Sequence, residues 1–422
     1  MRVVLTCWGS LGDFYPFLAL AVRLKAMGHE PVMATCEFYR QRTSDAGIRF
    51  HPVRPDVDPT DSTTIQRVMD PRHGTEVILR ELLVPRIREA FDDLAAVAQD
   101  ADLLVSHPVT FAAPLVAGSL RLKWLSAVLA PTSFFSIHDL PLLPPHPAVT
   151  RMARLTPWTA RGFLWIAGRI TAPWTAPIRS FRDELGLPDA GDPLYAGQFS
   201  PFGTLALFSP VFGPPQPDWP PSTVATGFVF PVEEAVLSSS VQAFLDEGEP
   251  PIVFTLGSSA VGAAGAFYDE SIGAAEATGR RAILLAGLDP RNRPRRPLPR
   301  TIITAEYAPH AALFPRAVAV VHHGGIGTTA AALRAGRPML VVPHAHDQSD
   351  NAFRAEKLGV ARVLDARRYR ADRAADHLRA LLGAPAYQAS ARDAADRIGR
   401  EDGVRTAADT IAAHASRSGS LS

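Results

Sequence analysis

Two adjacent histidines, three glycines and two threonines stand within eight residues, HHGGIGTT, from His322 to Thr329. The stretch is expected to end a buried strand and to begin a helix. Glycines let backbone N–H groups approach a ligand, and a helix amino terminus carries unpaired donors and a partial positive charge. With the hydroxyl and imidazole donors, this combination suits a diphosphate. A tight turn with threonine caps would explain the same residues.

Other ligands fit this stretch less well. No lysine follows the glycines before the threonines, so the stretch is not a Walker loop, and it lacks the GxGxxG order of a dinucleotide-binding turn. The chain offers four nearby histidines as possible zinc ligands: His322, His323, His344 and His346. Because adjacent residues at a strand end point in opposite directions, we expect no metal site.

Two further polar clusters follow predicted strands. In PHAHDQSDNA (343–352), Asp347 accepts hydrogen bonds and Gln348 both donates and accepts, so this pair suits neighbouring sugar hydroxyls. As an alternative, Asp347 only caps a helix. In EYAPHAALFP (306–315), Tyr307 could stack on a base and His310 could hydrogen-bond to one, whereas core packing is the alternative for Tyr307.

An acidic residue stands where the first helix is expected to begin. In GSLGDFYP, Asp13 follows Ser10 and the first predicted strand. As an N-cap, Asp13 would need no other role. At the carboxyl end of a strand it could instead act as a general base, and one residue could do both.

These clusters require strands and helices that alternate along the chain. The predicted strands of the first half are RVVLTCW, EPVMATC, IRFHPV, ADLLVSH and LKWLSAVLA, and those of the second are PIVFTLGSS, RAILLAG, TIITAEY, AVAVVHHGG and RPMLVVPH. Short strand–helix–strand units imply parallel pairing and right-handed crossovers. We therefore predict two doubly wound, Rossmann-like α/β domains. Ligands of such sheets bind beyond the carboxyl ends of the strands, which predicts a cleft between the domains.

The predicted boundaries follow composition. A first domain covers 1–208, and a proline-rich linker covers 209–227, because proline at this density cannot continue a helix or a central strand. A second domain covers 228–384. Helices at 385–414 are expected to pack back toward the first domain, and a tail at 415–422 to be disordered.

The amino-acid composition limits the classes to which this protein can belong. With 422 residues, 47% hydrophobic and 20% charged, the chain is large enough for two globular cores. A net charge of +1 argues against a nucleic-acid partner held by bulk charge. Cys7 and Cys36 lie in apolar strands and are expected to be buried free thiols, as in a reducing cytosol. No apolar run or leader pattern predicts a membrane span or a signal peptide, so we expect a cytoplasmic protein that could still touch a membrane surface.

The quoted motifs resemble those of GT-B glycosyltransferases of family 1. HHGGIGTTAAALRAGRPMLVVPHAHDQSDNA, preceded by YAPHAALFP, is similar to their donor-binding signature. GSLGDFYPFLALAVRLKAMGH resembles the amino terminus of the bacterial branch, which includes glycopeptide, macrolide and sterol glycosyltransferases. PPQPDWPPSTVATGF and PTSFFSIHDLPLLPPHP are most similar to the catalytic rhamnosyltransferases of rhamnolipid synthesis. The resemblance covers about residues 1–382.

The resemblance implies an inverting enzyme that needs neither metal nor cofactor. It would move a sugar from a UDP- or dTDP-sugar held by the second domain to a hydroxyl of a hydrophobic acceptor held by the first. Tyr307 would stack on the pyrimidine, and His322 would hold the diphosphate. The donor-binding residues would be Ser10, Ser258, Tyr307, His310, His322, Gly324, Gly325, Gly327, Thr328, Asp347 and Gln348. A nucleotide-sugar epimerase and a non-catalytic helper are the alternatives, and a monomer and a homodimer are both open.

The resemblance also bears on the base and the acceptor. Asp13 matches the acid of a GSxGD loop, although Leu11 replaces the usual arginine. Plant-type members carry a histidine base after the first strand, where this chain has none, which favours Asp13. His138 and Asp139 are the reserve candidates. For the acceptor pocket we expect aromatic residues from the loop 131–147 and the helical region 150–187, namely Phe134, Phe135 and Trp174.

Overall fold

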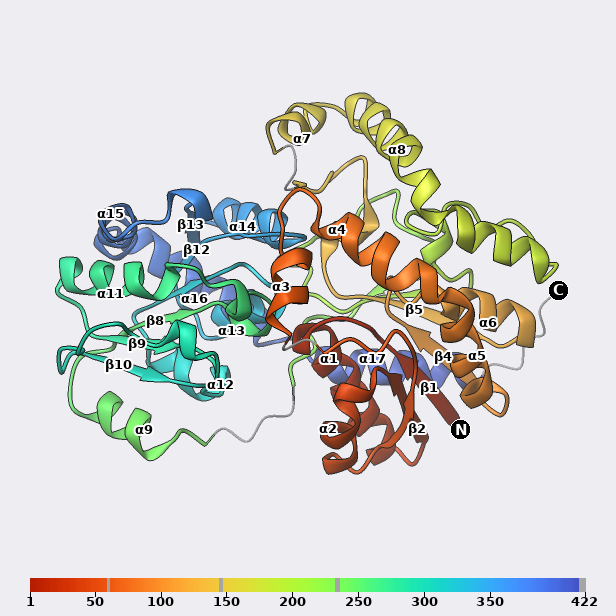
Figure 1. Cartoon of the computed structure of the whole chain (residues 1–422), viewed down its shortest axis with the longest axis horizontal. Helices are drawn as coiled ribbons and strands as arrows, with labels where there is room; N and C mark the ends of the chain where they lie inside the picture. The colour runs from red at the N-terminus through yellow and green to blue at the C-terminus, as the bar shows by residue number, and fades with distance from the viewer. Residues whose placement is uncertain (59–60, 144–146, 232–235, 417–422) are drawn as a thin grey trace. The chain divides into compact units, whose positions relative to one another are not determined.

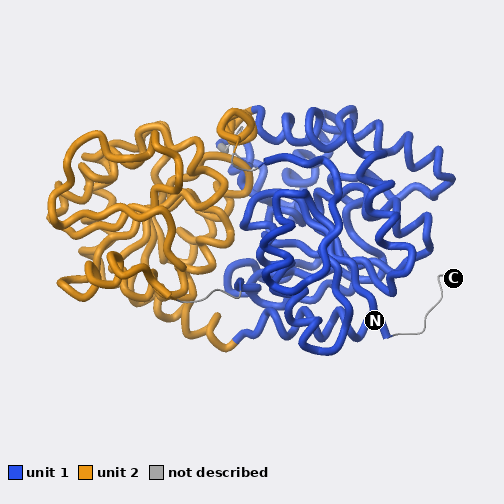
Figure 2. Tube along the Cα trace, turned by 60° about the horizontal axis from the view of Figure 1, so that its bottom comes forward, with its two compact units in different colours: residues 1–59, 73–231, 401–422 blue, residues 60–72, 232–400 orange. Residues whose placement is uncertain are grey.

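The computed structural model describes residues 1–58, 61–143, 147–231 and 236–416. These residues form two compact units, each built on one parallel sheet (Figures 1 and 2). Unit 1 comprises residues 1–59, 73–231 and 401–422, and unit 2 comprises 60–72 and 232–400. The predicted α/β fold with two doubly wound domains is confirmed.

Unit 1 holds a seven-stranded sheet in the order β3-β2-β1-β4-β5-β6-β7. Its strands are β1 (Arg2–Thr6), β2 (Glu30–Thr35), β3 (Arg49–Pro52), β4 (Leu103–Ser106), β5 (Trp124–Val128), β6 (Thr204–Ala206) and β7 (Thr223–Ala225). The central strands β1 and β4 are neighbours, and their buried side chains are almost all aliphatic. Strand order reverses between them, which makes this edge the place where a doubly wound sheet binds ligands.

The helices of unit 1 flank this sheet. They are α1 (Leu11–Ala26), α2 (Arg40–Asp45), α4 (Gly74–Val77), α5 (Ile87–Ala98), α6 (Ala112–Leu120), α7 (Pro147–Ala153), α8 (Pro157–Glu184) and α17 (Gly403–Ser416). Short 3-10 turns occupy Glu37–Tyr39, Val84–Arg86, Pro131–Phe134 and Ala196–Gln198, and Ile78–Leu83 is π-helical. The predicted helical region 150–187 is confirmed by α7 and α8.

Unit 2 holds a six-stranded sheet in the order β10-β9-β8-β11-β12-β13. Its strands are β8 (Ile252–Thr255), β9 (Ala282–Leu285), β10 (Ile302–Ala305), β11 (Ala319–His322), β12 (Met339–Val341) and β13 (Ala361–Val363). Its helices are α3 (Ser62–Val68), α9 (Ser239–Asp246), α10 (Gly257–Ala260), α11 (Phe267–Thr278), α12 (His310–Leu313), α13 (Ile326–Arg334), α14 (Gln348–Lys357), α15 (Ala371–Gly383) and α16 (Pro385–Ile398). The 3-10 turns are Val261–Ala263, Pro290–Asn292, Phe314–Arg316 and Ala366–Arg368.

The unit boundaries differ from the predicted domains in the proline-rich region. Residues 209–227 belong to unit 1, and β7 lies inside them. Thr223–Ala225 contains no proline and forms an edge strand that pairs with β6 alone, so the prolines around it break no ladder. The segment is therefore part of the first sheet.

The carboxyl-terminal helices divide between the units. The segment 385–414 was expected to return to the first domain as a whole, but α16 packs against α13 in unit 2 and only α17 packs against α1 in unit 1. Glu401 accepts a hydrogen bond from the Ser209 hydroxyl at 2.7 Å and so anchors the start of this last segment. Helix α17 continues to Ser416, and the rest of the predicted tail lies outside the described residues.

A short early segment also joins unit 2. Ile65 and Met69, in and just after α3, lie in the hydrophobic core formed by the helices and strands of that unit. The predicted free thiols are confirmed, because Cys7 and Cys36 are both buried and unbonded to each other. Burial raises the pKa of Cys36 to about 12. None of the helices in the described part of the chain is long and apolar enough to span a bilayer.

Candidate active site

Three loops meet at the carboxyl edge of the unit 2 sheet. They follow the neighbouring strands β8, β11 and β12, whose carboxyl ends lie at the same edge because all the pairs are parallel. The strand order reverses between β8 and β11, the position at which doubly wound sheets bind ligands. The loops carry Gly257–Ser259, His322–Gly325 and Pro343–Asp347, so the predicted clusters are brought together.

His322 is a neutral hydrogen-bond donor at this edge. Its Nδ1 accepts the backbone N–H of Gly324 at 3.1 Å, so the ring proton is carried by Nε2. That Nε2 is buried and has no partner among the described residues. Burial lowers the pKa of His322 to about 3, so the ring is uncharged near neutral pH. A buried donor without a partner is costly unless a ligand uses it.

His323 instead supports the loops. Its Nε2 lies 3.2 Å from the Ser259 hydroxyl, and the two histidine rings are almost perpendicular, with 6.4 Å between their centroids. Ser259 therefore makes the contact that links the β8 loop to the β11 loop, whereas the predicted Ser258 is half-buried in α10. Within the described part of the chain, no three His, Cys, Asp or Glu residues are grouped as metal ligands would be.

The amino terminus of α13 is open. Gly325 is its N-cap and offers no side chain, and Thr329 donates back to the Gly325 carbonyl at 3.0 Å. The alternative in which threonines cap this helix is therefore wrong. Gly324 has φ +94°, and a Cβ there would lie 3.0 Å from the Gln348 carbonyl oxygen, so only glycine fits. The N–H groups of the first turn, which includes Gly327 and Thr328, face the ligand edge without a side-chain cap.

Asp347 and Gln348 are arranged differently from the predicted pair. Asp347 stands at the N-cap position of α14 but makes no capping bond, and its Oδ2 accepts from the Asn351 amide at 2.7 Å. The alternative of a simple cap is therefore wrong. Gln348 is buried, and its Oε1 accepts the N–H groups of His344 and Ala345 at 2.8 and 3.1 Å. Its side-chain oxygen therefore braces the loop, and the predicted contact with a sugar is left to the amide nitrogen.

Asn351 was not singled out from the sequence. Its buried amide nitrogen donates to the Gly324 carbonyl at 2.9 Å and to Asp347 at 2.7 Å. It thus joins the glycine loop to the carboxylate of the neighbouring loop. The i, i+4 spacing of Asp347 and Asn351 was a signal for their own contact, but the bond to Gly324 depends on the sheet.

We expect Asn351→Ala to raise the KM for the donor about tenfold, because two buried hydrogen bonds are lost. Stability should fall by about 1–3 kcal/mol for the same reason. Gln388→Ala is the matched control, since the Gln388 amide donates to the Gly336 carbonyl at 2.9 Å away from these loops. Steady-state kinetics and thermal unfolding check both variants. An unchanged KM in Asn351→Ala would remove Asn351 from the site.

Tyr307 and His310 lie after β10. Tyr307 is 59% exposed, so the alternative of core packing is wrong for it. The His310 ring stacks on Phe314 with 4.3 Å between centroids and lies 6.3 Å from the Tyr307 ring. Burial lowers the pKa of His310 to about 4, so this ring is also neutral.

Acid should destabilise unit 2. The pKa of His322 is lowered to about 3 and that of His323 well below its usual value, both by burial. Below pH ~6.5 the unfolded chain binds protons that the folded unit cannot, so stability falls as pH falls. Each histidine should remove up to about 1.4 kcal/mol per pH unit as the pH falls from ~6.5 to ~5, with the full slope reached at the lower end. Calorimetry across this range checks the slope, which His323→Gln should reduce; a pH-independent melting temperature would contradict it.

Asp13 completes the first turn of α1 in unit 1. Ser10 is the N-cap, and Asp13 is the third helical residue, whose Oδ2 accepts from the Ser10 N–H at 2.7 Å and hydroxyl at 3.0 Å. The alternative in which Asp13 is the N-cap is therefore wrong, because the N-cap is Ser10, three residues earlier. Ser10, a predicted donor contact, is part of this capping box, and its contact with a donor stays a prediction. The box fixes the carboxylate and leaves Oδ1 outside it.

His107 is the partner of that oxygen, and it was not a candidate from the sequence. Its Nε2 lies 3.8 Å from Asp13 Oδ1. His107 directly follows β4, which pairs with β1, so the two residues meet at the point where the strand order reverses. Burial lowers the pKa of His107, and Asp13 opposes that shift. The signal was a histidine at a predicted strand end, but the pairing of the strands was needed to place it beside Asp13.

The reserve candidates for the base, His138 and Asp139, do not lie beside Asp13 or His107 among the described contacts. His138 is exposed, and its backbone N–H donates to the Ser136 hydroxyl at 3.1 Å. Asp139 forms an ion pair with Arg154 at 3.1 Å. Neither has a contact with Asp13 or His107 among those the structure describes.

The predicted acceptor residues are largely packed within unit 1. Phe134 is buried and stacks on Trp219 at 4.2 Å between centroids. Phe135 lies 5.0 Å from the Tyr195 ring, and Trp174 packs against the core. The pocket beside His107 is lined by other residues, among them Thr110, Phe111, Trp124, Ile178 and Gln198. Aromatic content alone did not separate core from pocket.

Comparison with known proteins identifies the two halves. Residues 3–119 match the glycosyltransferase family 28 N-terminal domain, and residues 281–403 match the erythromycin biosynthesis protein CIII-like C-terminal domain. O-mycaminosyltylonolide 6-deoxyallosyltransferase of Streptomyces fradiae is 32% identical over 420 residues, 96% of each chain. Vancomycin aglycone glucosyltransferase of Amycolatopsis orientalis is 30% identical over 367 residues, 85% of each chain.

Solved structures agree on the fold. The glycosyltransferase of kitacinnamycin has a TM-score of 0.73 at 19% identity, over 98% of each chain. The glycosyltransferase VinC, solved with dTDP, has a TM-score of 0.68 at 21% identity, over 98% of this chain and 99% of its own. Two parallel sheets, each with candidate ligand-binding residues after the carboxyl ends of its strands, define the GT-B architecture. The chain belongs to the family 1 glycosyltransferases, enzymes that transfer sugars.

Proposed function

We propose that this enzyme is an inverting, metal-independent glycosyltransferase that moves a sugar from a dTDP- or UDP-sugar to a hydroxyl of a hydrophobic natural product. The observation that carries the donor side is the buried Nε2–H of His322, which has no partner in the described residues and lies beside the open start of α13. The dTDP in the VinC structure and the acceptors in the names of the tylonolide and vancomycin relatives support the substrate classes.

On the donor side, the diphosphate is the leaving group. As the bond from the anomeric carbon to the β-phosphate oxygen breaks, the electron pair remains on that oxygen. Neutral Nε2–H of His322 and the N–H groups of the first turn of α13 stabilise this charge. These donors stabilise the negative charge of the diphosphate, as a divalent cation does in other enzymes. The ring of Tyr307 stacks on the pyrimidine.

On the acceptor side, Asp13 takes the proton. The acceptor oxygen forms the new bond to the anomeric carbon while its proton passes to Oδ1 of Asp13, the oxygen left outside the capping box. A single displacement inverts the anomeric centre. The Nε2 of His107 lies 3.8 Å from this Oδ1 of Asp13, and the pocket lined in part by His107 marks the side from which the acceptor approaches. The cleft between the domains stays a prediction.

A panel of nucleotide sugars and hydrophobic alcohols tests the proposal. Mass spectrometry should show the added hexose or deoxyhexose only when both substrates are present, also in excess EDTA. The anomeric proton coupling of the product should show inversion. Retention, or a strict need for a divalent cation, would contradict the mechanism. A nucleotide-sugar epimerase would instead interconvert the donors without an acceptor.

A further inference from the structure

Seven of the twelve exposed large hydrophobic side chains in the described part of the chain lie between Val149 and Ile170, on α7, α8 and the turn between them. They are Val149, Met152, Leu155, Trp158, Trp165, Ile166 and Ile170. Trp158 is 79% exposed and Trp165 65%. Residues 158, 165, 166 and 170 recur at helical spacing, so they form one stripe on α8. We call this set the α7–α8 face.

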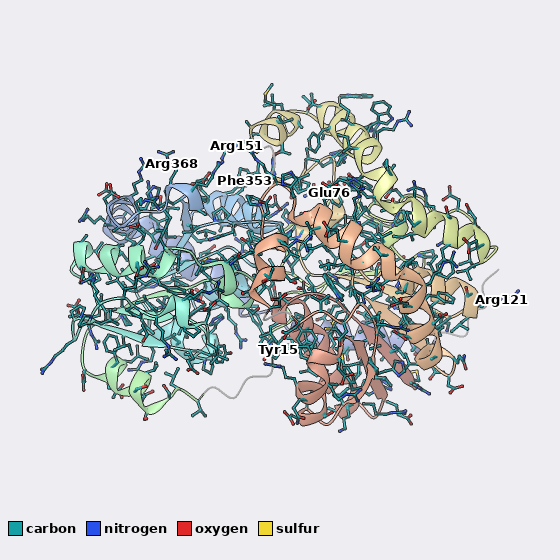
Figure 3. The ribbon with its side chains drawn as sticks, in the orientation of Figure 1. Tyr15, Glu76, Arg121, Arg151, Phe353 and Arg368 are labelled. Carbon is teal, nitrogen blue, oxygen red and sulfur yellow. The ribbon has the colours of Figure 1, made fainter. Side chains whose placement is uncertain are left out.

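Basic residues share this face. Arg161 lies over the Trp158 ring at 5.6 Å from its centroid, and Arg169 lies over the Trp165 ring at 5.4 Å. Arg151, labelled in Figure 3, is exposed on α7. Within the described residues none of these three arginines forms an ion pair.

Acidic residues are missing from the same stretch of sequence. From Leu140 to Arg182 there are six arginines and neither aspartate nor glutamate. The occupant that this surface suits must therefore be both apolar and anionic. Tryptophan and arginine, each with an apolar body and a polar tip, are the side chains that lie at the boundary between lipid headgroups and acyl chains.

We propose that the α7–α8 face docks on the surface of an anionic phospholipid bilayer. The tryptophans and aliphatic side chains enter the headgroup region, and the arginines meet lipid phosphates. A second copy of the chain is a poor occupant, because a two-fold contact would bring the same unpaired cations face to face. The inference rests on this face alone and does not depend on the donor or acceptor assignments.

Co-sedimentation of the full chain with phosphatidylcholine vesicles, with and without phosphatidylglycerol, tests the proposal. We expect binding that requires phosphatidylglycerol and weakens as salt is raised. Arg161→Gln/Arg169→Gln should weaken it about 25-fold, or about fivefold per arginine. Trp158→Ser should weaken it at least about tenfold. Leu288→Ser, at a position 77% exposed in unit 2, and Arg373→Gln/Arg392→Gln are the matched controls and should bind like the wild type.

Quenching by brominated lipids gives a second readout. Tryptophan fluorescence of the wild type should be quenched on binding, and Trp158→Phe/Trp165→Phe should lose most of that quenching while still binding. Wild-type protein that stays unbound, or Trp158→Ser that binds like the wild type, would overturn the proposal. A dimer that Trp158→Ser converts to a monomer, measured by light scattering, would overturn it too, since a second copy would then cover the face.

Discussion

Asp13→Asn should lose at least about a hundredfold in kcat while the affinity for the nucleotide donor stays unchanged. The substitution keeps the shape of the side chain and removes the proton acceptor. An amide oxygen can still accept from Ser10, so α1 should lose no more than about 1 kcal/mol of cap stabilisation. Turnover under saturating donor and acceptor, with calorimetry of donor binding, measures the two effects separately.

The capping box calls for a control. Ser10→Ala removes the hydroxyl that bonds to Asp13 and to the Gly12 N–H, so it weakens the cap without removing the base. It should reduce stability as much as Asp13→Asn does, with only a small loss of kcat. If both variants lost turnover equally, Asp13 would act through the helix and the base would lie elsewhere.

His107→Gln distinguishes a positioning role from a structural one. Protonated His107 would pair with the Asp13 oxygen that has to receive the proton, so kcat/KM of the wild type should fall as pH falls through the lowered pKa of His107. In the variant, kcat/KM should be lower than in the wild type and should no longer fall at acidic pH. A merely structural histidine would leave the shape of the profile unchanged.

Much of the fold could be predicted because its signals are local. Buried apolar runs that end in glycine or polar clusters located ten strands and some of the helices between them, although α5 and α6 were not predicted. The strands β6, β7 and β13, of three residues each, were not predicted, and β12, which is equally short, was located because a polar cluster follows its apolar run. The division of the last helices between two units rests on packing, such as that of α17 on α1, which no local pattern reports.

The candidate site shows the same limit. The sequence predicted which loops face the ligand edge, because those loops follow strands, and it predicted His322 as the phosphate donor, an assignment that stays a prediction. It did not predict His107, Asn351 or Ser259, whose contacts with Asp13, Gly324 and His323 require neighbouring strands or loops to be known. The sequence also predicted that the oxygen and the nitrogen of the Gln348 side-chain amide both bind a sugar. The oxygen already accepts hydrogen bonds from two backbone N–H groups.

His322→Leu should weaken the binding of dTDP or UDP by about 10- to 150-fold, the loss expected for one hydrogen bond to a charged group. Leucine fills a similar volume but offers no donor, and the Gly324 N–H loses its acceptor. His322→Gln restores a donor and should recover part of the affinity. Calorimetry with the diphosphate and with the free nucleoside measures both, and only the diphosphate affinity should change.

The neighbouring histidine provides the control for this result. His323 has its Nε2 beside Ser259 and lies against the glycine loops, so His323→Gln should lower stability more than diphosphate affinity. Equal losses in the two histidine variants would mean that the loops, rather than one donor, hold the phosphate. A loss confined to His322 would give its Nε2–H the oxyanion role, since this Nε2 has no partner among the described residues, whereas the Nε2 of His323 lies beside Ser259.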